Sequence, residues 1–125
     1  MDDHQVKIIQ TRRGQDVARM ELQRRGNEFR AQVIQAFYGA ARSDAGLDLA
    51  QQSRALAGRG LVVAEGRVRA GKSSPVEATR AQVQLAETDL LVRRAQTLKA
   101  NHDRELARVT GAVTQPFDPL QHADR

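Results

Sequence analysis

Residues 70–82, with the sequence AGKSSPVEATRAQ, interrupt two long segments rich in Ala, Leu, Arg and Gln whose patterns are otherwise helical. Gly71 can adopt the left-handed conformation that ends a helix, and Ser73 or Ser74 can cap the next one. Pro75 suits the first position of that second helix, because its missing N–H would have no partner there. The interruption therefore predicts a helical hairpin with a defined tip.

The pattern divides the chain into five predicted parts. They are a strand remnant with its connector at residues 1–14, a long helix at 15–70, a tip turn at 71–75, a return helix at 76–110 and an irregular tail at 111–125. The strand is expected because residues 5–11 alternate weakly, and Gly111 is expected to close the return helix. At about 1.5 Å per residue, the helices would be roughly 80 and 50 Å long. The predicted fold class is all-α, a long antiparallel helical hairpin of the coiled-coil type.

Both predicted helices carry apolar residues on two faces. The first helix has Leu49, Leu56, Val63 and Ala70 at seven-residue intervals, Ile34, Ala41, Ala55 and Val62 beside them, and a row of small residues at Ala50, Ala57 and Ala64. The return helix has a coiled-coil seam, interrupted by polar Lys99 and His102, that consists of Ala78, Ala81, Leu85, Thr88, Val92, Ala95, Leu106 and Val109, and a second row at Val76, Val83, Leu90 and Thr97. Because one hairpin cannot cover both faces of each helix, we expect an assembly of several hairpins.

Composition excludes several classes of function. The chain has no cysteine, so it can form neither a disulfide nor a thiolate metal site. The net charge of +5 invites a nucleic-acid partner, but acidic residues are interleaved with the basic ones, as on the solvated face of a long helix. An aromatic content of 3% also offers little surface for stacking on single strands. The N-terminus lacks a secretory signal pattern, and no apolar run approaches the roughly twenty residues that span a bilayer.

Three sets of residues invite a functional interpretation and are better explained structurally. They are the histidines His4, His102 and His122, the acidic pair Asp44 and Asp48, and the Gly-Lys-Ser at residues 71–73. The histidines lack metal-ligand spacing, and the aspartates, four apart on one helix face, suit a solvated pair. The Gly-Lys-Ser does not follow a strand, as a phosphate loop would. We therefore expect no catalytic, cofactor or metal site, and the chain is not expected to be an enzyme.

A set of motifs between residues 29 and 111 matches a known family. The motifs are an aromatic pair, an Arg-rich approach to a tip glycine, and the Ser-Pro-Val-Glu and Arg-Ala that follow it. In this sequence they are Phe37, Tyr38, Arg67, Arg69, Gly71, Ser74, Pro75, Val76, Glu77, Arg80 and Ala81, with a looser match at Gly14, Ala18, Arg19 and Met20. On these motifs the chain resembles one repeat of the TolC-type outer-membrane efflux proteins, and most of all their heavy-metal, CzcC-like branch.

The resemblance implies a passive duct without a cofactor. In that family three protomers, each with two such repeats, form an outer-membrane β-barrel that is continued by a periplasmic helical barrel. The hairpin tips would contact a periplasmic adaptor, which links the duct to an inner-membrane pump. In this chain the adaptor-contacting tip would consist of Ala70, Gly71, Lys72, Ser73, Ser74, Pro75, Val76 and Glu77. Since one repeat is present and barrel strands are not, we expect a fragment of the channel component, which would reach the membrane only through strands that are absent here.

Two alternative functions remain open. A periplasmic adaptor hairpin is also a long antiparallel coiled coil, but adaptors usually place a Leu near the tip, and none occurs between Leu61 and Leu85. A free-standing basic coiled-coil protein that binds other proteins or nucleic acid is favoured by the charge and disfavoured by the tip motif. The sequence of the two helices is not expected to identify the exported substrate, because the pump rather than the duct selects it.

Overall fold

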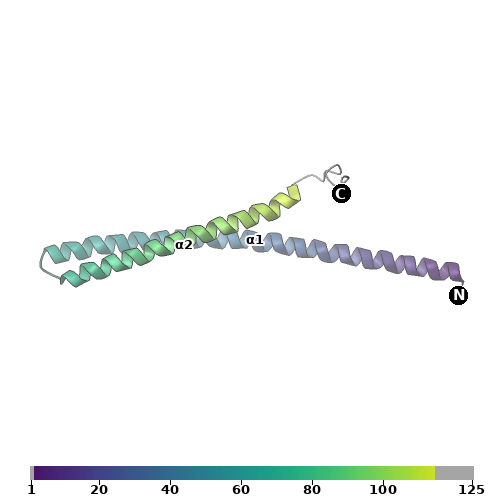
Figure 1. Cartoon of the computed structure of the whole chain (residues 1–125), viewed down its shortest axis with the longest axis horizontal. Helices are drawn as coiled ribbons and strands as arrows, with labels where there is room; N and C mark the ends of the chain where they lie inside the picture. The colour runs from purple at the N-terminus through teal and green to yellow at the C-terminus, as the bar shows by residue number, and fades with distance from the viewer. Residues whose placement is uncertain (1, 115–125) are drawn as a thin grey trace, which may run out of the picture. The chain divides into compact units, whose positions relative to one another are not determined.

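The computed structural model describes residues 2–114, which form two helices, α1 (Asp3–Arg69) and α2 (Pro75–Thr114). The chain divides into two units, Met1–Gln35 and Ala36–Arg125. In the second unit, α2 returns antiparallel beside the later part of α1 after a short turn (Figure 1). The predicted all-α helical hairpin is confirmed.

The strand predicted at residues 5–11 is wrong, because α1 already includes this segment. The Thr11 hydroxyl donates to the Lys7 carbonyl at 2.9 Å, and the Val6 N–H donates to the Asp2 carbonyl at 3.1 Å, each bond spanning one helical turn. An alternation this short fits a helix as well as a strand. A lone strand would also leave its backbone groups without partners, whereas a helix satisfies them within the segment.

The expected end of the return helix at Gly111 is also wrong, since α2 continues to Thr114. A glycine weakens a helix by only about 1 kcal/mol relative to Ala, and tertiary packing readily outweighs that. Here Val109, two residues earlier, is only 3% exposed, so this part of α2 is packed. Residues 115–125 of the predicted tail lie outside the described residues.

The coiled-coil seam predicted on α2 is confirmed. Thr88, Val92 and Val109 are buried, and the remaining predicted members are half-buried, namely Ala78, Ala81, Leu85, Ala95 and Leu106. The buried Thr88 hydroxyl donates to the Leu85 carbonyl at 2.7 Å, so it carries no unsatisfied polar atom into the interface. The alternation of three and four residues therefore identifies the face that α2 turns toward α1.

The face that α1 turns toward α2 is rich in small residues. Ala36, Gly39, Ala40 and Ser43 are buried, and the row of Ala50, Ala57 and Ala64 continues as half-buried positions. Leu47, Leu61 and Val68 of α1 are half-buried, whereas the predicted row that includes Leu49 and Leu56 remains uncovered, with both of these residues 65% exposed. Small side chains allow the two helices to approach closely. The row of larger apolar residues that includes Leu49 and Leu56 has no partner in the described chain.

The first unit is the N-terminal part of α1. Its side chains are mostly exposed, including those of Val17, Met20 and Leu22. Its surface carries ion pairs between residues one helical turn apart. Arg24, for example, bonds Glu21 at 2.5 Å and Glu28 at 2.7 Å. Exposed pairs of this kind contribute little to stability, so the backbone hydrogen bonds carry the helix here. No helix within residues 2–114 combines the length and hydropathy needed to cross a bilayer.

Candidate functional site at the hairpin tip

The end of α1 is closed by backbone hydrogen bonds around Gly71. This residue has φ of 70°, the left-handed conformation predicted for it. The Lys72 N–H donates to the Arg67 carbonyl at 2.9 Å, and the Gly71 N–H donates to the Val68 carbonyl at 3.0 Å. These two bonds form a Schellman motif, which satisfies carbonyls that a helix end otherwise leaves open. The helix therefore ends for a local chemical reason.

The start of α2 is capped by Ser74. Its hydroxyl accepts a hydrogen bond from the Val76 N–H at 3.3 Å, and its carbonyl accepts one from the Glu77 N–H at 3.0 Å. Pro75 takes the first helical position, as predicted. Within residues 2–114, no bond runs from the Ser74 N–H to the Glu77 carboxylate, which accepts a hydrogen bond from Arg80 at 3.4 Å.

Ser73 performs a different task from Ser74. Its hydroxyl accepts a hydrogen bond from Nε of Arg67 at 3.0 Å, which ties the turn back onto the last turn of α1. Arg67 thus contributes its carbonyl to the Schellman motif and its side chain to the turn. The tip is held from both helices by bonds that span only a few residues.

The tip presents an exposed surface on this fixed backbone. Ser73 is half-buried, and the other predicted tip residues are exposed, namely Ala70, Gly71, Lys72, Ser74, Pro75, Val76 and Glu77. Their chemistry is that of hydrogen bonds, one amine and one carboxylate, and it includes no nucleophile with an adjacent base. Among residues 2–114 there is also no group of three or more His, Asp or Glu side chains placed to hold a metal ion. Such a surface suits docking against another macromolecule.

Polar contacts across the hairpin were missed by the sequence analysis. Lys99 bonds Asp44 on α1 and also Asp103 on its own helix at 2.9 Å, and Arg54 pairs with Asp89. The hydrogen bond to Asp44, and then that to Asp103, raises the pKa of Lys99 above its usual range. A signal was available, since Lys99 interrupts an apolar seam and an acid follows it by four residues. The pairs show which residues of α1 and α2 lie opposite each other.

The residues weighed as alternative sites have separate structural roles. Asp44 pairs with Lys99, whereas Asp48 accepts a hydrogen bond from Gln52 at 2.9 Å. His102 is half-buried in the seam, as predicted, and its ring lies over Gly39 of α1. His4 is exposed in the first unit, and His122 lies outside the described residues.

The fold and the tip define an antiparallel helical hairpin with an ordered, exposed turn. The chain is similar to the cobalt-zinc-cadmium resistance protein CzcC of Cupriavidus metallidurans, with 30% identity over 116 residues. These residues are 93% of this chain and 28% of CzcC, so the chain spans little more than a quarter of its relative's length. No protein-family model matches the chain, and no solved structure matches it.

Proposed function

We propose that this hairpin belongs to the outer-membrane channel component of a tripartite efflux system that exports heavy-metal cations. The observation that carries the proposal is the similarity to a cobalt-zinc-cadmium resistance protein over 93% of this chain, the tip included. In this role the hairpin is part of the wall of a duct and performs no catalysis. The charge on its surface solvates the helices, and the energy for export comes from a separate pump.

In this proposal the tip, residues 70–77, contacts a periplasmic adaptor. The geometry supports such a contact because the turn is exposed and its backbone is held by the Schellman motif and the Ser74 cap. A surface that is ordered before binding loses little conformational entropy when it docks. Lys72 and Val76 then offer one charged and one apolar contact on either side of the turn.

The proposed duct also requires hairpins to pack side by side, as in a trimer of the full-length protein. The register of the hairpin supports this arrangement. With Arg54 opposite Asp89, the exposed Leu56 of α1 stands within one helical turn of the level of Leu90 on α2. Because Leu56 and Leu90 both lie outside the seam, α1 of one hairpin would meet α2 of the next with all tips at one end. A head-to-tail contact of this kind closes into a ring when the rotation per copy allows it.

Site-specific cross-linking tests the proposed tip contact. A photo-reactive amino acid replaces Lys72, and the full chain is mixed with the periplasmic adaptor encoded beside a heavy-metal pump of the same organism. We expect an adduct from position 72 and none from a matched probe at Gln96, which is exposed in the middle of α2. Equal adducts from both positions, or none from position 72, would refute the tip assignment.

A resistance assay tests the efflux role separately. Deletion of the gene that encodes this hairpin should lower the concentrations of cobalt, zinc and cadmium at which the cells still grow. A gene with Gly71→Val should fail to restore resistance, because a β-branched residue is strained at φ of 70°. Unchanged metal sensitivity after deletion, with no second copy of the gene present, would contradict the proposal.

A further inference from the structure

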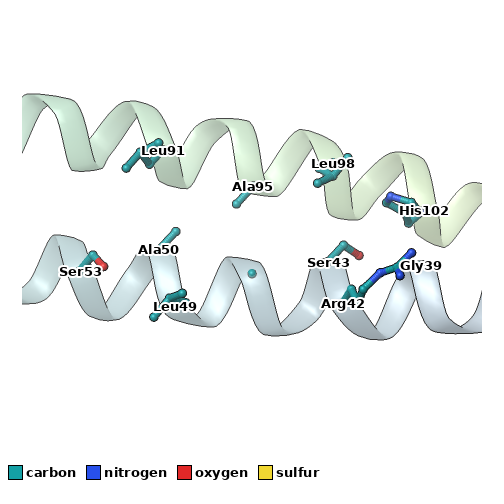
Figure 2. Close-up of a pocket in the computed structure, with 11 residues that line it drawn as sticks. Gly39, Arg42, Ser43, Leu49, Ala50, Ser53, Leu91, Ala95, Leu98 and His102 are labelled. Atoms are coloured by element: carbon teal, nitrogen blue, oxygen red, sulfur yellow. The ribbon is translucent and has the colours of Figure 1, made fainter.

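An apolar groove of about 370 Å³ lies between α1 and α2 in the second unit (Figure 2). Half-buried Ala50 and Ala95 form its floor, and exposed Leu49, Leu91 and Leu98 rise beside them. Gly46 widens the groove, because no atom of another side chain or of the facing helix lies within 4 Å of the place where a Cβ would stand. The volume falls in the range of small-molecule sites, and the lining is apolar as in most of them.

One end of the groove is polar. Arg42 and His102 line it there, next to Gly39, and in Figure 2 both side chains extend toward the space between the helices. Within residues 2–114 neither side chain has a hydrogen bond or an ion pair, so their N–H groups are available to a ligand. The carboxylate nearest in sequence, that of Asp44, is bound by Lys99, and no acidic residue lines the groove.

We propose that this groove binds a single-chain anionic amphiphile, namely a fatty-acid carboxylate. The carboxylate accepts hydrogen bonds from the Arg42 guanidinium and the His102 ring, and Arg is suited to holding such a group with two parallel bonds. The alkyl chain follows the floor from Gly46 toward Ser53. From Arg42 to Ser53 the helix rises about 16 Å, enough for a medium-length chain. The unpaired cationic end favours this ligand over a neutral or cationic one.

Titration of the full chain with decanoate below its micelle concentration tests the proposal. We expect the amide NMR signals of Gly46, Ala50 and Leu98 to shift with saturable binding. Affinity should rise about two- to fourfold for each added methylene that the groove covers. Decyl maltoside and decyltrimethylammonium serve as neutral and cationic controls, and binding of either with the affinity of decanoate would overturn the proposal. Binding that appears only when micelles form would overturn it as well.

Substitutions locate the site. Arg42→Gln should weaken decanoate binding about tenfold or more, through loss of a charged hydrogen bond. The matched Arg59→Gln, also an exposed α1 position, should leave it unchanged. Gly46→Leu fills the groove with a good helix former and should abolish binding while the circular dichroism stays helical. Unchanged binding in both Arg42→Gln and Gly46→Leu refutes the site. Binding that strengthens steeply as the protein is diluted would show that a second copy covers the groove, which also refutes it.

Discussion

Replacing Gly39 with Ala should not stabilise the hairpin, although Ala is normally the better helix former. The reason is the ring of His102, which lies across the Gly39 position on the facing helix. A Cβ at residue 39 would stand 2.6 Å from Nδ1 and 3.0 Å from Cε1 of that ring. The distance of 2.6 Å is shorter than real Cβ contacts, so the His102 ring must shift or the helices must separate.

The size of the effect follows from two opposing contributions. Overpacking a buried contact costs about 1–3 kcal/mol, whereas the change from Gly to Ala in a helix contributes about 1 kcal/mol of stability. The two nearly cancel or leave a net loss of up to about 2 kcal/mol at residue 39. The matched Gly46→Ala meets no neighbouring side chain or facing helix within 4 Å and should retain the whole favourable contribution. The two variants should therefore differ by about 1–3 kcal/mol.

Thermal unfolding followed by circular dichroism at one protein concentration measures this difference. His102→Ala removes the ring, so Gly39→Ala made in that background should become stabilising. The coupling between the two positions, taken from the double-mutant cycle, should equal the overpacking contribution. Equal stabilisation of the wild-type chain by Gly39→Ala and Gly46→Ala, or a cycle without coupling, would contradict overpacking by the His102 ring.

Three further outcomes are expected. Gly71→Ala should lower stability by about 1–2 kcal/mol, because only glycine adopts a left-handed conformation without strain. Gly71→Asn should lower stability less, and equal melting temperatures for the two variants would contradict the role of the φ of 70°. Ser74→Ala should destabilise the hairpin by about 1 kcal/mol through loss of the cap, and Ser73→Ala should destabilise it less. If denaturant titrations show the larger loss of stability for Ser73→Ala, the cap belongs to Ser73. Hydrogen bonds from Arg24 and then Arg25 lower the pKa of Glu21 below its usual 4.5. The contribution of this carboxylate to folding stability is therefore complete above pH 4.5 and is lost as the pH falls through the lowered pKa. Glu21→Gln should make the loss of stability with falling pH shallower, and an unchanged pH dependence would refute this.

Local chemistry explains which parts of the candidate site could be predicted from the sequence. The conformation of Gly71 and the place of Pro75 follow from bonds that span a few residues, so short motifs specify them. Both serines were candidates for the cap, and Pro75 at the first helical position places Ser74 directly before α2. The bond from the Arg67 side chain to Ser73 was not predicted.

Periodicity alone was less reliable. On α2 a long alternation of three and four residues identified the seam, whereas at residues 5–11 a short alternation suggested a strand inside α1. A period needs several repeats before it distinguishes a helix from a strand. At Gly111 the local preference for a helix end did not prevail, and Val109 just before it is buried.

The sequence by itself determined two long helices, the turn that joins them and the presence of apolar residues on two faces of each helix. The sequence also identified the seam of α2, but only the tertiary structure decided which face of α1 meets it. Periodicity shows which residues share a face of a helix, but it does not show how closely two helices can pack. Small residues of α1 fit closely against α2, with His102 over Gly39 and Lys99 against Asp44. As a result, the row of Ala50, Ala57 and Ala64 faces α2, and the row of Leu49, Leu56 and Val63 stays outside.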